Sequence, residues 1–183
     1  MAEIVAETDR LYLRTWDLED REEFVRHCNT TAVTRFLGGV QTEQEYTAGF
    51  ERIESYQREF GHTFWLVERK SDGAMLGFCG LKVARDLDPP LKGEVEIGWR
   101  LREDSWGRGY AREAAEAAFA WAWRNLDIPR IISITAASNE PSWRLMERLG
   151  MTRCPDLDFA HPKFAREHPL SQHITYVMER PRT

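Results

Sequence analysis

The sequence predicts a single α/β domain, and three observations support this fold class. The chain has 183 residues, of which 42% are hydrophobic, and this suits one domain with a sizeable core. Residues 94–102 alternate apolar and polar side chains with the period of a half-buried strand. After a glycine loop, residues 111–126 carry apolar side chains at intervals of three and four, which is the pattern of an amphipathic helix.

The elements at the amino terminus are predicted from alternation and from capping residues. Residues 8–16 alternate enough to form a first strand. Asp17 and Asp20 can then cap a helix that runs to about His27. Residues 29–39 are polar at their start and end in glycine, which is typical of a loop.

A second helix and a hairpin follow. The helix begins at residue 42 or 43 and ends near Gly61. Residues 62–68 and 74–81 are strand-like runs joined by Ser71-Asp72-Gly73. Because glycine tolerates positive φ, this turn predicts a β-hairpin.

The carboxyl-terminal part is predicted to add two strands around one helix. Residues 129–136 are rich in β-branched side chains and form the next strand. Asn139 caps a helix that has proline near its first turn and that ends at Gly150. Residues 173–178 alternate as a last strand.

Composition and charge exclude several function classes. A net charge of −5 without a lysine- or arginine-rich run argues against a nucleic-acid surface and is compatible with a cationic amine. No apolar run has the length of a membrane span or the pattern of a signal peptide, so we expect no membrane partner and a cytoplasmic location. The spacing of the three cysteines indicates neither a disulfide framework nor a zinc site. They are Cys28, Cys79 and Cys154.

Two groups of residues invite a metal interpretation, and neither has suitable spacing. Asp86 and Asp88 lack a third ligand nearby and are better explained as a solvated loop. His161, His168 and His173 lie in a proline-broken segment instead of on one helix face. We therefore expect no metal.

The glycine loop is the first candidate binding feature. Gly107 and Gly109 precede the central helix, whose first backbone N–H groups lack intrahelical partners. These amides and the helix dipole favour a phosphate at this position. A tight connection without a ligand is the alternative, because no dinucleotide or P-loop fingerprint is present.

Three sequence blocks resemble the GNAT superfamily of acyl-CoA-dependent N-acetyltransferases. They are Glu96-Ile97-Gly98-Trp99, the run from Trp106 to Ala114, and Asn139-Glu140-Pro141-Ser142 with Leu149-Gly150-Met151. Their order and separations resemble most the ribosomal-protein alanine acetyltransferases, the RimJ/RimL-like branch. The resemblance covers about residues 8–178 and implies one N-acetyltransferase domain, 1–183. Its expected fold is a mixed, mostly antiparallel sheet flanked by helices, with splayed central strands that form the acyl-CoA cleft.

The resemblance implies acetyl-CoA as cosubstrate. The amides from Gly107 to Ala111 would hold the pyrophosphate, and the central strand would pair with the pantetheine arm. Trp106 replaces the Gln or Arg of the superfamily pattern, as an aromatic residue often does in this branch. The implied cofactor-binding residues are Trp99, Arg100, Leu101, Trp106, Gly107, Arg108, Gly109, Tyr110, Ala111 and Asn139.

Candidate catalytic residues also follow from the resemblance. Glu96 would take the proton of the amine, directly or through water, and Glu94 is the reserve. An exposed strand carboxylate without a catalytic role is the alternative for both. Many members use a tyrosine as the acid for the thiolate, where this chain has Met146. Ser142 is then the candidate acid, or else a serine that satisfies helix amides.

The acceptor is left open by the sequence. In the family the region around Arg35 and Phe36 lines the acceptor pocket, although Phe36 also fits a core position; Glu94 is a further candidate contact. We expect direct transfer to a primary amine, either a protein N-terminus in an open groove or a small amine in a pocket closed by the tail around residues 159–164. The alternative is a non-catalytic acyl-CoA-binding sensor or assembly module. Both a monomer and a homodimer are compatible with the sequence.

Overall fold

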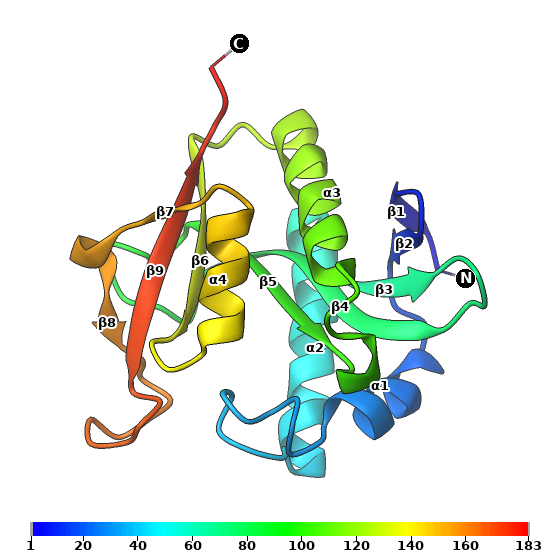
Figure 1. Cartoon of the computed structure of the whole chain (residues 1–183), viewed down its shortest axis with the longest axis horizontal. Helices are drawn as coiled ribbons and strands as arrows, with labels where there is room; N and C mark the ends of the chain where they lie inside the picture. Colours follow the sequence, from blue (N-terminus) through cyan, green and yellow to red (C-terminus); the bar gives the residue numbers. More distant parts are fainter. Residues whose placement is uncertain (1, 183) are drawn as a thin grey trace.

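The computed structural model describes residues 2–182 as a nine-stranded sheet covered by helices (Figure 1). The strand order is β1-β2-β3-β4-β5-β6-β9-β7, with β8 beside β9. Within residues 2–182, β5 and β6 are parallel and the other strand pairs are antiparallel, which confirms the predicted mixed sheet. The strands are β1 (Ile4–Glu7), β2 (Leu11–Arg14), β3 (Phe64–Arg69), β4 (Met75–Val83), β5 (Val95–Leu101), β6 (Arg130–Ala136), β7 (Thr152–Arg153), β8 (Phe159–Ala160) and β9 (Gln172–Glu179). The helices are α1 (Asp20–Cys28), α2 (Glu43–Phe60), α3 (Tyr110–Asn125) and α4 (Glu140–Arg148).

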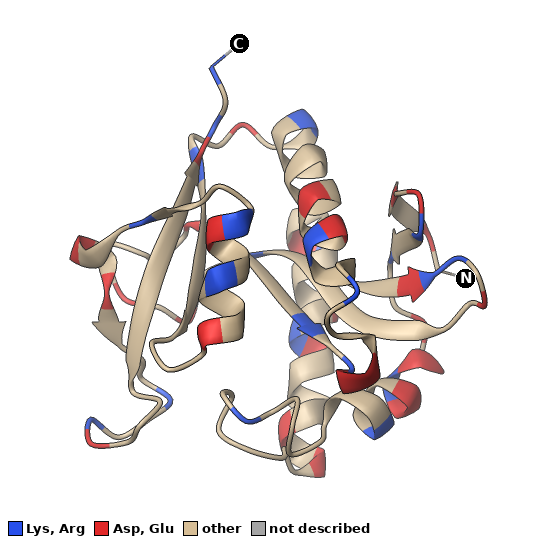
Figure 2. Ribbon diagram, viewed as in Figure 1, with Lys and Arg blue, Asp and Glu red and all other residues tan. Residues whose placement is uncertain are grey.

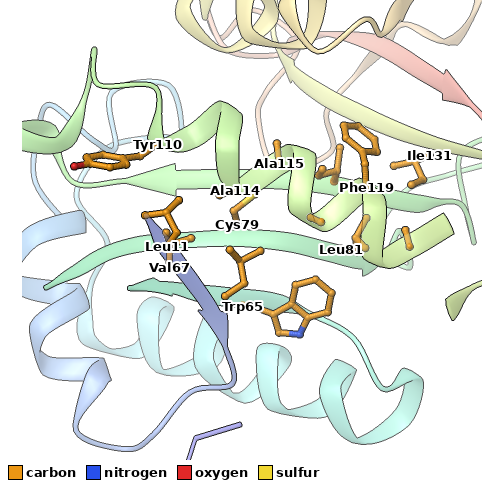
Figure 3. Close-up of a cluster of buried hydrophobic side chains, with 14 of the residues drawn as sticks. Leu11, Trp65, Val67, Cys79, Leu81, Tyr110, Ala114, Ala115, Phe119 and Ile131 are labelled. Atoms are coloured by element: carbon orange, nitrogen blue, oxygen red, sulfur yellow. The ribbon is translucent and has the colours of Figure 1, made fainter. Parts of the chain in front are cut away.

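The helix α3 packs on the sheet through a stripe of small side chains. Ala114, Ala115, Ala118 and Ala122 are completely buried. Because alanine is short, the helix axis comes close to the strands, and the larger Phe119 fills the space toward Ile131 of β6 (Figure 3). The same core includes Met146 of α4, so α3 and α4 cover one face of the sheet.

The opposite face is covered by α1 and α2. Phe24 of α1 and Phe50 of α2 pack with Phe78 of β4, and their rings meet edge to face or stacked at 5.7–5.8 Å. Figure 1 shows α2 behind the sheet and α3 and α4 in front of it. The central strand β5 is therefore sandwiched between two helical layers, and its alternate residues face different layers.

The exposed sides of α3 and α4 carry both signs of charge. Figure 2 shows Lys and Arg interspersed with Asp and Glu along both helices, and the pairs Arg112–Glu116 and Glu140–Arg144 are one helical turn apart. The described helices include none that is both long and apolar enough to cross a bilayer.

The first strand differs from the prediction. Residues 8–16 were expected to form one strand, but the chain forms the hairpin β1–β2 with a turn at residues 8–10. The Thr8 hydroxyl accepts the backbone N–H of Leu11 at 2.9 Å and closes this turn. A side chain that bonds its own backbone interrupts the strand, and the alternation alone did not reveal it.

The predicted N-cap of α1 is wrong, whereas the starts of α4 and α2 are confirmed. The N-cap of α1 is Glu19, and Asp20 instead binds Arg14 through both carboxylate oxygens at 2.7 and 2.8 Å. Asn139 takes the N-cap position of α4, but its side-chain amide donates to the Thr135 hydroxyl. Thr42 is the N-cap of α2, which confirms the start predicted at residue 42 or 43, and it forms a complete capping box with Glu45.

Candidate active site

The loop before α3 has the conformation that an anion site needs. Gly107 and Gly109 adopt φ values of +71° and +80°, which side chains rarely tolerate. Gly109 is the N-cap of α3, so the first amides of this 16-residue helix open into the loop. A β-carbon added at Gly107 would meet no atom of the described chain within 4 Å, so a ligand can approach the backbone here. The glycine loop therefore fits a phosphate-bearing ligand.

A distant arginine holds this loop in place. Arg10 donates through Nη1 to the carbonyl oxygen of Arg108 at 3.0 Å and through Nε to Glu113 at 2.6 Å. Its guanidinium carbon lies 4.6 Å from the centre of the Tyr110 ring. Glu113 also accepts the Thr8 hydroxyl at 2.6 Å. The β1–β2 turn and the first turn of α3 are thus tied together around the loop, which sequence reasoning missed.

We expect Arg10→Met to weaken the binding of acetyl-CoA about tenfold, equivalent to about 1.4 kcal/mol. The substitution leaves the loop glycines in place but removes the hydrogen bond that holds the Arg108 carbonyl. Calorimetric titration measures the dissociation constant. Arg124→Met, at the exposed far end of α3, is the control and should bind as the wild type does. Equal affinities of the two variants would contradict a role for Arg10 in ordering the loop.

Strands β5 and β6 separate next to the loop. The two are in register at Glu96 and Ile132, and the Ser133 hydroxyl donates to the carbonyl oxygen of Ile97 at 3.0 Å. Among residues 2–182, no later residue of β5 pairs with β6, whereas β5 stays paired with β4 as far as Leu101. The backbone of residues 98–101 therefore has an edge that faces β6 without a ladder partner. This divergence, visible in Figure 1, confirms the predicted splayed strands.

Around this edge, the predicted cofactor residues have different surroundings. Trp99 packs against the core that lies under α3. Trp106 is 48% exposed, and its indole N–H donates to the carbonyl oxygen of Leu101 at 2.8 Å. Tyr110 is buried and Arg108 is exposed. Their contacts with a cofactor stay predictions.

Glu96 lies on the face of β5 that looks toward α1 and α2. Its side chain is 9% exposed, and its Oε2 atom lies 3.4 Å from Nζ of Lys82. Lys82 also pairs with Asp86 at 3.5 Å, and Asp86 accepts the Tyr56 hydroxyl. Burial raises the pKa of the Glu96 carboxyl, and the Lys82 ammonium opposes part of that rise. A carboxyl with a raised pKa is suited to accept a proton near neutral pH.

Glu94 is already engaged in an ion pair. Its Oε1 atom accepts from Nη2 of Arg130 at 2.6 Å and from Nε at 3.1 Å, which joins the start of β5 to the start of β6. A structural role therefore accounts for this side chain, and its roles as reserve base or acceptor contact stay predictions.

On the other side of the diverging strands, Ser142 lies in the first turn of α4. Its backbone N–H donates to the carbonyl oxygen of Asn139 at 3.1 Å, and its side chain is half-buried. Met146, one turn later, is 1% exposed and belongs to the main core. The residue in the family's tyrosine position is thus a core residue here.

Two segments far apart in sequence meet where the acceptor pocket is predicted. Arg35 is exposed and lies 5.0 Å from the ring centre of the half-buried Phe36. Lys163 in the tail donates to the carbonyl oxygen of Leu37 at 2.8 Å. Phe164 lies so close to Gly38 that an added β-carbon would meet its ring at 3.2 Å. The tail therefore closes against the loop of residues 30–40.

The same tail also contributes to a cluster of aromatic and imidazole rings. The rings of His161 and His173 are 4.6 Å apart, and Phe159 lies within 5.8 Å of both. Burial lowers the pKa of both histidines, that of His161 to about 4, so the cluster is uncharged at neutral pH. Residues 2–182 contain no group of three or more His, Cys, Asp or Glu placed to hold a metal ion.

The two fully buried thiols, Cys28 and Cys79, are poorly suited to form an acyl-enzyme. Cys28 and Cys79 are buried, and Cys154 is half-buried in a separate small core. Burial raises the pKa of Cys28 to about 12 and raises that of Cys79 as well. A thiol with so high a pKa stays protonated at neutral pH and is a weak nucleophile.

Comparison with known proteins agrees with this geometry. A model of the acetyltransferase (GNAT) domain matches residues 10–152. The uncharacterized protein YkkB of Bacillus subtilis is 27% identical over 147 residues, which cover 79% of this chain and 83% of that protein. The acetyltransferase of Agrobacterium tumefaciens superposes with a TM-score of 0.77 at 27% identity, covering 98% of this chain and 94% of that one.

Two further solved structures share the fold at lower identity. The ribosomal L7/L12 α-N-protein acetyltransferase RimL has a TM-score of 0.77 at 16% identity, with 98% and 95% of the two chains covered. The spermidine N-acetyltransferase of Vibrio cholerae, solved with CoA and spermine, has a TM-score of 0.72 at 14% identity, with 94% and 97% covered.

Proposed function

The chain belongs to the GNAT acetyltransferase family, and from this premise we propose that it transfers an acetyl group from acetyl-CoA directly to a primary amine. The observation that carries the proposal is the unpaired edge of β5 between the glycine loop and Glu96. A cofactor arm bound along this edge would meet an acceptor that arrives from the α1–α2 side.

The residues around this edge fit the cofactor. Acetyl-CoA, when bound, supplies an activated acetyl thioester. The amides of residues 107–111 would hold its pyrophosphate, and Arg108 adds a cation at the same loop. The exposed edge of residues 99–101 would pair with the amides of the pantetheine arm, and Asn139 would contact it from the opposite side. One amide of this edge, if aimed at the thioester carbonyl, would stabilise the developing oxyanion by about 3 kcal/mol.

Glu96 would then accept the proton of the attacking amine, directly or through one water. Its burial favours this role, because an exposed carboxylate with an ordinary pKa is a weaker base at neutral pH. Ser142 would donate to the departing thiolate or order a water that does. We favour transfer within a ternary complex, because the buried thiols have raised pKa values. Detection of an acylated cysteine during turnover would contradict this route.

The acceptor class has two candidates, a protein N-terminus and a small amine. RimL and the spermidine acetyltransferase act on these two classes by name, and each resembles this chain through the fold. The tail that closes against residues 37–38 favours a small amine, because a peptide needs an open groove. Arg35 and Phe36 would line the entrance. We further propose a cytoplasmic protein, active as a monomer or homodimer.

Measuring acetyl-CoA binding by calorimetry, and then free-thiol release with a panel of amines and short peptides, tests the enzyme. We expect release with at least one amine, and about a tenfold lower kcat in Ser142→Ala with unchanged affinity for acetyl-CoA. Ser138→Ala, in the exposed turn before α4, is the control. Binding without thiol release would favour the alternative, a non-catalytic acyl-CoA sensor. Absence of binding would overturn the assignment of the glycine loop.

A further inference from the structure

Arg100 is a half-buried cation that has no anionic partner among residues 2–182. Across residues 2–182 no carboxylate lies within 4.0 Å of its guanidinium, and its Nε atom is buried without a hydrogen-bond partner. Its Nη1 atom donates to the side-chain oxygen of Gln41 at 3.2 Å. The rings of Phe24 and Phe78 lie 5.8 and 5.5 Å from its guanidinium carbon. Burial lowers the pKa of Arg100 to about 10.

Other arginines of this protein have the carboxylate partner that Arg100 lacks. Two other half-buried arginines have carboxylate partners at 2.6–2.8 Å: Arg14 binds Asp20 and Glu68, and Arg130 binds Glu94. Arg102, two residues after Arg100, binds Asp104 at 2.6 and 2.8 Å. An unpaired charge out of water is costly, because neither solvent nor a counterion stabilises it. Arg100 therefore needs an anion that the described chain does not supply.

A second cation approaches the same region from the tail. Lys163 is exposed, and its hydrogen bond to the carbonyl oxygen of Leu37 holds it in place. Its pKa is lowered by burial and by the positive charges of Arg100 and Arg52, while Glu45 opposes the decrease. The Glu45 carboxylate itself is engaged in the capping box of α2. Arg100 and Lys163 thus create a positive potential at this end of the acceptor side.

Apolar groups lie between Arg100 and Glu96 on this face of β5. Glu96, Gly98 and Arg100 alternate along β5 and point to the same side of the sheet. The ring of Phe64 covers Gly98, where a β-carbon would lie 2.9 Å from it, and stacks on Phe78 at 4.9 Å. The α-carbons of Glu96 and Arg100 are about 13 Å apart at the rise of a strand. The site therefore has a carboxylate at one end, aromatic faces in the middle and a guanidinium at the other.

We propose that the acceptor is an amine that also carries a carboxylate, which Arg100 and Lys163 bind while the amine reaches toward Glu96. This inference rests on the proposed function. In the reaction the amine nitrogen bonds to the acetyl carbon, the carbon–sulfur bond breaks, the thiolate leaves and the amine proton passes to Glu96. The carboxylate of the acceptor is unchanged and serves only for binding. Because the two charged ends are four residues apart, an extended ω-amino acid fits better than glycine.

Matched acceptors test the inference. We expect 6-aminohexanoate to have a KM at least tenfold lower than its neutral isostere 6-aminohexanamide. In Arg100→Met the ratio of the KM for the amide to the KM for the acid should fall close to one, mainly because the KM for 6-aminohexanoate rises. Lys163→Met should reduce the same ratio about threefold. Arg102→Met removes an arginine that already has a carboxylate partner and should keep the wild-type ratio.

Binding of the acetylated products gives a second readout that does not require turnover. Calorimetry with the CoA-loaded protein should show that N-acetyl-6-aminohexanoate binds at least tenfold more tightly than its amide, and that Arg100→Met removes this difference. Acetyl transfer without a preference for the carboxylate would overturn the inference and leave the proposed function intact. If no amine is acetylated, the proposed function fails. The product titration then decides alone whether Arg100 forms an anion site, and equal binding of acid and amide would refute it.

Discussion

Replacing Glu96 by glutamine should lower kcat at neutral pH about 100-fold or more, the usual contribution of a general base. Glutamine has nearly the same shape but cannot accept the amine proton. Calorimetry should give an unchanged affinity for acetyl-CoA, because the side chain points to the face of β5 opposite α3. Glu116→Gln, which removes an exposed carboxylate of α3, is the control. If Glu96→Gln turns over at the wild-type rate, Glu96 is not the base and another group accepts the proton.

The pH dependence should have a definite sign. The base works as a carboxylate, so activity is lost as the pH falls through the pKa of Glu96. Because burial raises this pKa, the acidic limb of kcat/KM should lie above the ordinary carboxyl value of about 4.3. Lys82→Met removes the cation that opposes the rise, so the limb should move to higher pH. A limb that stays in place in Lys82→Met would contradict the pairing at 3.4 Å.

The substitution Gly77→Ala should destabilise the fold by about 4 kcal/mol, a value at the severe end for a single substitution. Gly77 has a φ of +133°, and a β-carbon there would lie 2.1 Å from the carbonyl oxygen of Arg100 and 2.8 Å from the α-carbon of Leu101. Backbone atoms of a neighbouring strand cannot move aside as a side chain can. Relief of the overlap would push β5 away from β4 and displace the edge that we assign to the cofactor.

Urea denaturation measures this effect, with Gly73→Ala as the matched control. Gly73 also has a positive φ of +69°, but a β-carbon there would meet no described atom within 4 Å. Its cost should be the backbone strain alone, about 1 kcal/mol. Similar midpoints for the two variants would mean that the chain relaxes around Gly77.

Many of the helices, strands and turns could be predicted because the sequence patterns that specify them are local. The turn at Gly73, the start of α2 at Thr42 and the alternation of β5 each depend on residues close together in the chain. The side to which Glu96 points follows from the same alternation. The family motifs are equally local, and the match over residues 10–152 agrees with them.

The sequence by itself determined the turn at Gly73 and the loop before α3, which faces are apolar and to which family the chain belongs. Only the tertiary structure decided which charges meet. Arg10 and Glu113 are 103 residues apart, and Lys163 and Leu37 are 126 apart. The isolation of Arg100 is likewise invisible in the sequence, where acidic residues stand nearby at 103 and 104. Periodicity and turns follow from backbone geometry within a few residues, whereas the partner of a charge depends on how distant segments pack.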